Sequence, residues 1–384
     1  MKTRKVCWLD LTRFDAKPDK STWLEMGHEL NKFGFDVHIV TSFEKRPFES
    51  PNHKVSFINI PASPRSFLFK LSLLLKFIVY IIKMGDRTSI IIVPPAGLIA
   101  IPVMRLFNFK NIHLDIRTIP VRVRGFKRSI DKWILWDFTM RVFSRFATSY
   151  SFITERLRLA SEHAAGTSFP DYCIWSSGVS SEIFRKTDSL QAEASHDGKY
   201  NVFYHGTVTK DRGLFEVLHA VELVIQEEKL DLSLTIVGSG PDYPELKKRV
   251  TESPAADRIT LTGFVQYDRI PEILSHAICC ICPLPPRPEW QVSSPLKLFE
   301  YMAMEKPIIA TRIDAHLDVL ENEDFVVWTD SPVAEDIAKS IVQAYVERHT
   351  LNEAAKRGPE LVERSYDWSI LGNRFGTFLG KVYG

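Results

Sequence analysis

The sequence predicts an α/β protein made of two Rossmann-like, doubly wound domains that face a cleft. The chain has 384 residues, which exceeds what one hydrophobic core ordinarily holds. Short apolar runs alternate with segments of helical period along most of it, the pattern of parallel sheets with crossover helices. A polar stretch at residues 186–199 interrupts that alternation and predicts a linker between two similar halves. Such sheets bind ligands beyond the carboxyl ends of their strands, where the cleft is expected.

The first half alternates strand and helix. The apolar runs predict strands at 6–9, 36–41, 55–60, 89–93, 112–117, 149–153 and 172–175. The segments of helical period predict helices at 21–33, 66–84, 98–107, 129–146 and 155–162. Gly34 ends the first of these helices, and Pro94-Pro95 turns a strand into the helix at 98–107.

The second half repeats the alternation. Strands are expected at 201–204, 232–237, 259–261, 277–282, 308–310 and 325–328, and helices at 213–227, 244–251, 269–276, 295–305, 333–347, 352–363 and 368–383. Ser294 is a good N-cap for the helix at 295–305, and Pro295 suits its first position. Lys306-Pro307 ends that helix, and Gly358-Pro359 is a candidate break in a later one.

Charge is divided unevenly between the halves. Residues 1–180 contain 27 basic and 15 acidic residues, a net charge of +12. Residues 181–384 contain 22 basic and 32 acidic residues, a net charge of −10, so the whole chain carries +2. A basic half can face anionic lipid, nucleic acid or a phosphorylated acceptor. Asymmetry of this kind predicts two domains with different partners.

The five cysteines form no disulfide framework, and an odd number suits a reducing compartment. His276 with Cys279, Cys280 and Cys282 invites a zinc interpretation, but no second Cys-x-x-Cys pair or histidine cluster completes such a site. We interpret the three cysteines as small buried strand residues, with Cys279 facing opposite to the other two. The chain has no D-x-D motif, so a metal-held diphosphate is not supported.

The stretch at 293–310 carries the strongest functional signal. Lys297 and Glu300 interrupt the apolar face of its helix and, three residues apart, lie on the same side. The amides and the positive dipole end of a helix attract phosphate, and Lys297 adds a full positive charge there. Glu300 can accept two hydrogen bonds from a diol such as a ribose. This helix end either holds a nucleotide diphosphate sugar or is a capped core helix with a solvated lysine and glutamate.

The run S-S-P-L-K-L-F-E-Y-M-A-M-E-K-P-I-I-A resembles the donor-binding motif of the retaining glycosyltransferases of family 4, which have the GT-B fold. That motif carries two glutamates eight positions apart, of which Glu300 matches the second and Val292 stands at the first. The resemblance implies an N-terminal acceptor domain at 1–185, a linker at 186–199 and a nucleotide-sugar donor domain at 200–366. It also implies that a last helix, at about 367–384, packs back on the first domain.

The turn Y-H-G-T-V-T-K-D-R-G resembles a donor-binding turn of that family. Gly206 permits a tight turn with close approach of a ligand. Arg212 replaces a usual lysine, and Thr207 replaces a usual arginine. A guanidinium clamps a pyrophosphate through paired donors, so Arg212 and Lys297 would share the diphosphate. An ordinary strand-to-helix turn with a solvated arginine is the alternative.

Two further turns resemble parts of the same site. V-G-S-G-P, with Gly238 and Gly240, implies a backbone that lies near the nucleotide. T-G-F-V implies that the main chain at Val265 reads the edge of the base. Glycines that ease the entry to a helix, and the end of a core strand, account for these turns equally well.

The proline-rich loop at 282–294 is expected to line the donor-sugar pocket. Glu289 is the carboxylate nearest to the missing first glutamate, three positions before Val292. The remaining donor contacts are expected at the start of the helix, from Ser293, Ser294, Pro295 and Leu296.

The candidate contacts for an acceptor lie at the ends of strands in the first half. Asp115 and Arg117 share one face of a strand and can orient an acceptor hydroxyl, bind an acceptor phosphate or form a buried ion pair. Arg13, after the first strand, is a similar candidate. Many relatives place a histidine-aspartate pair where Arg117 and Thr118 stand, and His113 lies too early to supply it.

The first half combines basic and aromatic residues. Between Arg117 and Arg145 lie six further cations and five aromatic residues, and the apolar stretch at 67–84 contains three lysines. Those lysines keep the stretch short of a clean membrane-spanning helix, and no signal peptide follows the N-terminus. We expect a cytoplasmic protein that lies peripherally on the anionic inner face of the membrane. A core helix with a solvated basic face is the alternative.

Together these features predict a retaining glycosyltransferase. It would move a sugar from a nucleotide diphosphate sugar to a glycan or lipid-linked acceptor in cell-surface polysaccharide synthesis, with no cofactor and no metal. Arg212, Lys297 and Glu300 are the predicted catalytic residues. The alternatives are a nucleotide-sugar epimerase or other enzyme of the same fold, and a nucleic-acid-binding protein that uses the basic half. No nucleic-acid-binding motif occurs and the second half is acidic, so nucleic acid is not an expected partner.

Overall fold

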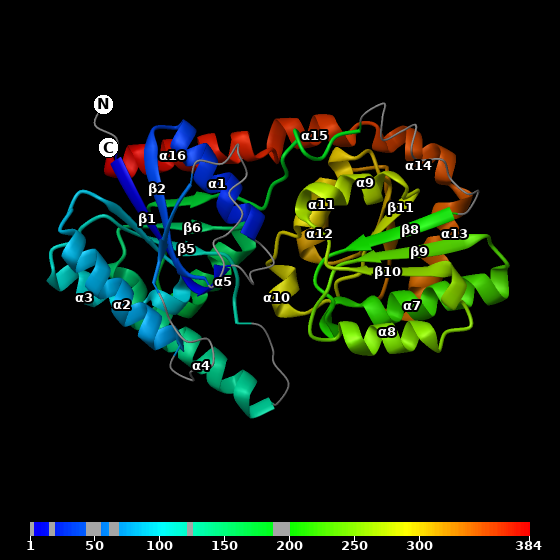
Figure 1. Ribbon diagram of the computed structural model, residues 1–384, viewed down its shortest axis with the longest axis horizontal. Coiled ribbons are helices and arrows are strands. Elements are labelled where there is room, and N and C mark those ends of the chain that lie inside the picture. Colours follow the sequence, from blue (N-terminus) through cyan, green and yellow to red (C-terminus); the bar gives the residue numbers. More distant parts are fainter. Residues whose placement is uncertain (1–3, 15–19, 44–54, 61–68, 121–125, 187–199) are drawn as a thin grey trace. The chain divides into compact units, whose positions relative to one another are not determined.

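A computed structural model of the 384-residue chain describes all residues except 1–3, 15–19, 44–54, 61–68, 121–125 and 187–199. The chain divides into two compact units (Figure 1). Unit 1 comprises Met1–Ser177 and Trp368–Gly384, and unit 2 comprises Gly178–Asp367. The predicted linker at 186–199 lies outside the described residues, apart from its first residue.

Unit 1 contains a parallel sheet with the strand order β3-β2-β1-β4-β5-β6-β7. All strands predicted in the first half are present: β1 (Arg4–Arg13), β2 (Phe35–Ser42), β3 (Ser56–Asn59), β4 (Ile90–Val93), β5 (Ile112–Ile116), β6 (Ser149–Phe152) and β7 (Tyr172–Ile174). The helices are α1 (Lys20–Lys32), α2 (Phe69–Met84), η2 (Pro95–Gly97), α3 (Ala100–Leu106), α4 (Phe126–Phe143), η3 (Ser144–Phe146), α5 (Glu155–Ala165) and α16 (Trp368–Tyr383).

The strand order of unit 1 reverses between β1 and β4. Because crossovers between parallel strands are right-handed, the connection from β1 to β2 runs over one face of the sheet. The connections from β3 to β4, β4 to β5 and β5 to β6 run over the other face. The sheet therefore carries α1 on one side and α2, α3 and α4 on the opposite side.

The last helix of the chain packs in unit 1. Phe375 of α16 stacks on Trp175 with ring centroids 5.2 Å apart, and its ring also lies 6.4 Å from Trp8. Glycines bring α16 close to α1, because a Cβ added at Gly372 would lie 2.2 Å from Cβ of Glu29. The N-terminal and C-terminal segments thus share one core.

Unit 2 contains a second parallel sheet, of order β10-β9-β8-β11-β12-β13. Its strands are β8 (Tyr200–His205), β9 (Leu232–Val237), β10 (Ile259–Gly263), β11 (Cys279–Cys282), β12 (Ile308–Thr311) and β13 (Val326–Thr329). The helices are η4 (Lys210–Arg212), α7 (Leu214–Leu223), η5 (Val224–Glu228), α8 (Tyr243–Thr251), η6 (Ala256–Arg258), η7 (Tyr267–Arg269), α9 (Ile270–Ser275), α10 (Pro288–Gln291), α11 (Leu296–Ala303), α12 (Asp314–Leu320), α13 (Ala334–Val346), α14 (Arg348–Ala355) and α15 (Gly358–Ser365). The two parallel α/β sheets confirm the predicted fold class.

Local details of unit 2 differ from the prediction. The loop at 282–294 contains the short helix α10, and α12 was not expected. The helix expected at 352–363 is two helices, α14 and α15, which meet next to the suspected break at Gly358. Gly358 has no room for a side chain, because an added Cβ would lie 2.3 Å from the carbonyl oxygen of Met302 in α11.

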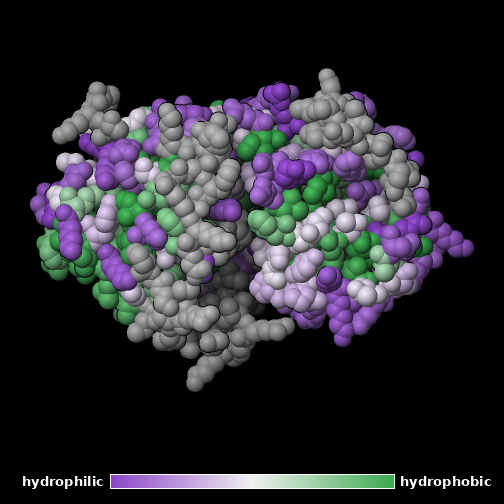
Figure 2. Space-filling view, viewed as in Figure 1, coloured by the Kyte–Doolittle hydropathy of each residue, from purple (hydrophilic) through white to green (hydrophobic). Residues whose placement is uncertain are grey.

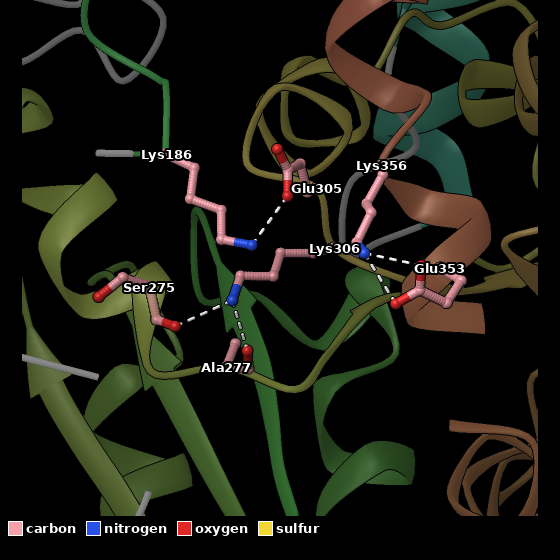
Figure 3. Close-up of polar contacts among 7 residues, drawn as sticks. All are labelled: Lys186, Ser275, Ala277, Glu305, Lys306, Glu353 and Lys356. Carbon is pink, nitrogen blue, oxygen red and sulfur yellow. Dashed lines mark hydrogen bonds and ion pairs between the residues drawn. The ribbon is translucent and has the colours of Figure 1, made fainter. Parts of the chain in front are cut away.

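A partly buried lysine fixes the turn that follows α11 (Figure 3). Lys306 Nζ donates hydrogen bonds to the carbonyl oxygens of Ser275 and Ala277, at 2.9 and 2.6 Å, which join this turn to the segment between α9 and β11. Burial lowers the pKa of Lys306 to about 8. Beside it, Lys186 Nζ pairs with Glu305 at 2.8 Å. These contacts anchor the carboxyl end of α11.

The described residues include no helix that is both long and apolar enough to cross a membrane.

Candidate functional site

Three turns meet at the carboxyl edge of the unit 2 sheet. They follow β8, β9 and β10, and backbone hydrogen bonds join them. The amide of Gly206 donates to the carbonyl of Val237 at 2.9 Å, and that of Val208 donates to the carbonyl of Ser239 at 3.0 Å. The amide of Gly238 donates to the carbonyl of Gly263 at 2.8 Å. The predicted turns with Gly206, Gly238 and Gly240 therefore form one platform.

Glycine is required in this platform because the turns lie so close together. Gly206 and Gly238 both have φ of +137°, a conformation that residues with a side chain rarely adopt. A Cβ at Gly238 would lie 2.0 Å from the carbonyl oxygen of Gly206, and one at Gly240 would lie 2.3 Å from that of Val208. A Cβ at Gly206 would instead meet Lys297 Nζ at 3.1 Å. Gly206 thus leaves room for the predicted phosphate-binding lysine.

Lys297 is a buried cation without a hydrogen-bond partner. Only 5% of the residue is exposed, and the structure shows no hydrogen bond to its Nζ among the described residues. The ammonium lies 3.8 Å from the ring centroid of Tyr204, at the end of β8. A cation–π contact replaces only part of the lost hydration, so the group is ready to bind an anion.

Glu300 lies one turn further along α11 and is 1% exposed. Its Oε2 lies 2.8 Å from Nε2 of His205, the last residue of β8, and the two form an ion pair when the imidazole is protonated. The angles at these atoms do not make a hydrogen bond. The backbone amide of His205 donates to the hydroxyl of Tyr301 at 3.2 Å, which ties the same strand end to α11 again. Lys297 and Glu300 are therefore both held against the β8 turn.

The start of α11 differs from the prediction. The helix begins at Leu296, and Pro295 occupies the N-cap position with φ of −70° and ψ of 112°. Ser294 was expected as N-cap, but it precedes the cap and is itself buried. Ser293 donates its hydroxyl to the carbonyl of Trp290 at 2.8 Å, which joins α11 to α10. Among the described residues no side chain caps the helix, and the amide of Leu298 donates to the carbonyl of Pro295 at 3.1 Å.

Arg212 ends η4 and lies against α10. Its guanidinium carbon lies 4.8 Å from the ring centroid of Trp290, whose indole N–H donates to the carbonyl of Asp211 at 3.0 Å. Burial raises the pKa of the Cys282 thiol, and the positive charges of Lys297 and Arg212 both oppose that rise. Both cations therefore lie within electrostatic reach of Cys282, at the carboxyl end of β11.

Glu289 of α10 is 1% exposed, and both of its carboxylate oxygens are buried without a hydrogen-bond partner in the described part of the chain. A buried carboxylate in this state loses its hydration without compensation, so such groups ordinarily have a partner. The side chain therefore has two acceptor oxygens available for a polar ligand.

The other predicted donor contacts have smaller roles in the structure. Thr207 is half-buried, and its carbonyl accepts a hydrogen bond from the Tyr204 hydroxyl at 3.3 Å. Val265 is half-buried against the hydrophobic core that contains α11. Phe264, which precedes Val265 in the turn after β10, is exposed.

The cysteines behave as expected of small buried strand residues. All five thiols are free and buried. Cys279 packs in one hydrophobic cluster of unit 2, while Cys280 and Cys282 pack in the cluster on the other face. Among the described residues, no group of three or more His, Cys, Asp or Glu side chains is arranged to hold a metal ion.

The acceptor candidates lie in unit 1. Arg13 ends β1, where its Cα pairs in register with Ser42 of β2. Asp115 is buried and accepts a hydrogen bond from the Ser151 hydroxyl at 2.6 Å. Arg117 donates to the carbonyl of Trp175 at 2.8 Å, with its guanidinium carbon 3.6 Å from the centroid of the Trp175 ring. Asp115 and Arg117 therefore each have a structural contact within unit 1.

Three residues of the site were not given roles from the sequence. Tyr204, His205 and Trp290 contact Lys297, Glu300 and Arg212 respectively. Tyr204 and His205 stand in the turn motif and Trp290 in the proline-rich loop, but spacing alone does not show which cation or carboxylate each would meet.

Comparison with known proteins agrees with this geometry. Residues 199–346 match the family model described as "Glycosyl transferases group 1". The sucrose-phosphate synthase of Thermosynechococcus elongatus aligns with a TM-score of 0.82 at 16% identity, over 99% of both chains. The fold is that of the GT-B glycosyltransferases.

Two curated relatives align with part of this GT-B chain. Alpha-D-kanosaminyltransferase of Streptomyces kanamyceticus is 25% identical over 210 residues, 53% of each chain. GDP-mannose-dependent alpha-(1-6)-phosphatidylinositol monomannoside mannosyltransferase of Mycobacterium tuberculosis is 23% identical over 151 residues, 38% of this chain and 39% of its own length. The alignments thus span about half or less of these relatives. The family match covers the whole platform of unit 2, from β8 to α13.

Proposed function

We propose that this protein is a retaining glycosyltransferase that uses a nucleotide diphosphate sugar. The observation that carries the proposal is the buried ammonium of Lys297, which has no hydrogen-bond partner among the described residues and lies beside a glycine-rich turn, near the start of α11. A diphosphate would supply the negative charge and the acceptor oxygens that this group lacks. The match of residues 199–346 to a glycosyltransferase family supports this reading.

In the proposed reaction, the chain acts mainly on the charge that develops on the leaving group. The bond between the anomeric carbon and the diphosphate oxygen breaks, and a bond to the acceptor oxygen forms on the same face of the sugar. Lys297 and Arg212 would stabilise the growing negative charge of the diphosphate. The departing phosphate would accept the proton of the acceptor hydroxyl, so the step needs no protein base. Closure around the substrates would limit hydrolysis.

Two carboxylates would hold the rest of the donor. Glu300 would accept hydrogen bonds from the ribose diol while His205 holds its carboxylate in place. Glu289 would accept hydrogen bonds from hydroxyls of the transferred sugar, in place of the glutamate that Val292 replaces. The main chain around Val265 would contact the base. The expected metal independence follows from assigning the diphosphate to Lys297 and Arg212.

The acceptor is proposed to be a glycan or a lipid-linked glycan in cell-surface polysaccharide synthesis, reached from the inner face of the membrane. Arg13, Asp115 and Arg117 are its proposed contacts in unit 1. The mycobacterial relative is named as a phosphatidylinositol monomannoside mannosyltransferase, which supports a lipid-borne acceptor for a chain of this type. The basic charge of residues 1–180 supports the same location.

The proposal is tested first by ligand binding and then by turnover. A thermal-shift panel of UDP, GDP, ADP and TDP should show stabilisation by one diphosphate, which names the base. Purified protein is then given the matching nucleotide sugars, and nucleotide release is measured with and without acceptor glycans. Release of nucleotide with formation of a glycoside that keeps the anomeric configuration supports the proposal. Conversion of the nucleotide sugar to its epimer, without release, would instead identify an epimerase.

A further inference from the structure

Exposed hydrophobic side chains are concentrated on one side of unit 1. Of 17 large hydrophobic residues that are exposed among the described residues, ten lie on α2, α3, α4 and η3 or directly beside α3. They are Leu71, Leu75, Val79, Ile99, Leu106, Phe107, Ile134, Leu135, Phe138 and Phe146. Figure 2 shows hydrophobic surface on this side of unit 1, over α2 and α3. We call this surface the α2–α4 face.

Helix α2 has two apolar sides. Its inner side is buried on the sheet through Leu73, Leu74, Phe77 and Ile81. Its outer side carries Leu71, Leu75 and Val79, four residues apart and 47%, 55% and 49% exposed. A helix that only packs on a sheet would carry polar residues at those outer positions. The apolar outer stripe therefore needs a separate explanation.

Helices α3 and α4 continue the same surface. Ile99, which immediately precedes α3, and Leu106, the last residue of α3, are seven residues apart and are 54% and 86% exposed. Ile134 and Phe138, spaced at i and i+4 along α4, are 62% and 57% exposed. Arg105 joins the two helices, because it donates to the carbonyl of Phe146 in η3 at 2.7 Å. Since α2 also packs beside α3, and all three helices cover one face of the sheet, the patches are neighbours.

Cations border the apolar stripes. Lys76 and Lys83, seven residues apart, are exposed on the same side of α2 beside the stripe, and Arg141 and Arg145 are exposed at the end of α4 and in η3. Asp137 is the single exposed carboxylate among the described residues of these helices. Over the whole segment 69–146, the sequence holds 14 lysines and arginines against 4 aspartates and no glutamate. A hydrophobic surface with this charge is complementary to an anionic one.

We propose that the α2–α4 face docks on an anionic lipid bilayer, with its leucine, isoleucine and phenylalanine side chains among the acyl chains and its lysines and arginines at the headgroups. Exposed apolar side chains beside cations are the composition of interfacial membrane helices. Two copies of this face would bring like charges together, which disfavours self-association through it. The inference rests on the proposed membrane-peripheral function and names the surface that would serve it.

The test is sedimentation of the full chain with vesicles, which requires no sugar transfer. Wild type should bind vesicles of phosphatidylcholine mixed with phosphatidylglycerol and bind pure phosphatidylcholine much less. The double variant Lys76→Glu/Lys83→Glu should lower the partition coefficient by roughly 25-fold or more, because each cation near an anionic surface contributes about fivefold. The neutral variant Leu75→Ser/Val79→Ser should also weaken binding, because it removes the inserted apolar side chains.

The matched control is Lys247→Glu/Lys248→Glu, which makes the same charge change on the exposed side of α8 in unit 2. It should bind vesicles as wild type does. Thermal unfolding of all variants checks that each is folded. Equal binding by all variants, or no preference for anionic vesicles, would overturn the assignment. The assignment would also be overturned if sedimentation equilibrium showed a dimer that dissociates when the α2 residues are substituted, because the face would then join two copies of the chain. Vesicle binding by a protein that shows no turnover would contradict the proposed transferase activity and leave the docking surface standing.

Discussion

His205 Nε2 lies 2.8 Å from Glu300 Oε2, so the last residue of β8 meets the carboxylate proposed to bind ribose. Glu300 is 1% exposed and His205 7% exposed, so the pair is largely shielded from solvent. A carboxylate held in one rotamer binds a diol without further ordering. His205 is therefore a positioning residue for Glu300.

Replacing His205 should act on donor binding. His205→Ala should raise KM for the donor by roughly fivefold, as expected for loss of about 1 kcal/mol from a polar contact, with a smaller change in kcat. His205→Gln keeps a donor near Glu300 and should restore most of the affinity. Steady-state kinetics with varied donor concentration measure both. Equal KM values in all three proteins would show that His205 does not orient Glu300.

Removing the charge of Lys297 should raise the stability of the protein and lower its activity. Lys297→Met keeps much of the side-chain volume and removes a buried ammonium without a hydrogen bond, so the free energy of unfolding should rise by about 1 kcal/mol. The same change should lower kcat by at least roughly tenfold and abolish stabilisation by the nucleoside diphosphate. Urea unfolding and nucleotide-release assays give the two values.

The control for this variant is Lys339→Met, whose lysine is exposed and pairs with Asp336 at 2.9 Å. Its stability and its activity should both stay close to those of wild type. A Lys297→Met protein that is as active as wild type would remove this lysine from the proposed mechanism.

Glu289 should matter for the donor sugar more than for folding. Because neither of its oxygens has a hydrogen-bond partner in the described residues, Glu289→Gln breaks no hydrogen bond and should not lower the melting temperature. It should lower kcat/KM for the nucleotide sugar by roughly tenfold, while the affinity for the free nucleoside diphosphate stays the same. Calorimetric titration with the diphosphate supplies the second measurement. Loss of diphosphate affinity would place Glu289 near the phosphates or the base instead.

The close turns of unit 2 should not tolerate a methyl group. Gly238→Ala puts a Cβ 2.0 Å from the carbonyl oxygen of Gly206 and also requires φ of +137°. The free energy of unfolding should fall by about 3 kcal/mol or more. Gly34→Ala is the control, because φ is +100° there but no atom lies within 4 Å of the added Cβ. It should cost only about 1 kcal/mol. Similar losses at both positions would show that strain, and not crowding between turns, decides the cost.

A buried histidine should make the protein sensitive to acid. Burial lowers the pKa of His316 from 6.5 to about 4. Its Nδ1 donates to the carbonyl oxygen of Thr311 at 2.7 Å, and its Nε2 lies 3.3 Å from Cys282 Sγ. An unfolded chain takes up this proton near pH 6.5, whereas the folded chain does so only near pH 4. The contribution is complete above pH 6.5, and the free energy of unfolding falls by about 1.4 kcal/mol per pH unit as the pH drops below it.

His316→Asn should remove this part of the pH dependence. Urea titrations above pH 6.5 and near pH 5 compare the slopes of variant and wild type, in which the carboxylates contribute equally. The exposed His219→Asn serves as the control and should keep the wild-type slope. A His316→Asn slope equal to that of wild type would show that His316 takes up its proton in the folded state as it does in the unfolded one.

The sequence predicts the sheets well because each strand is a short apolar run between breakers. All strands from Val6 to Trp328 were expected, whereas their order within each sheet was not predicted and is seen only in the structure. The short helices α10 and α12 were missed. α10 begins at a proline inside a proline-rich loop, where composition indicates a loop and only tertiary contacts, such as Trp290 with Asp211, stabilise a helical turn.

The sequence predicted the residues of the candidate site, but it predicted few of the contacts that those residues make. Lys297 and Glu300 were found because they interrupt an apolar helix face, which spacing reveals directly. Their partners Tyr204 and His205 lie on another strand, and only the folded sheet brings the two segments together. Ser294 was a reasonable N-cap by type, but Pro295 took that position because its extended backbone suits a cap residue.

Unit 1 is interrupted in the sequence, since Trp368–Gly384 belongs to the same compact body as Met1–Ser177. During synthesis on the ribosome, unit 2 is complete before the last helix of unit 1 has left the exit tunnel. Until then, Trp8 and Trp175 lack their packing partner Phe375, and their rings are exposed to solvent or to a chaperone. A stop codon shortly before residue 368 would therefore damage the first-made half of the protein and leave the later-made half able to fold.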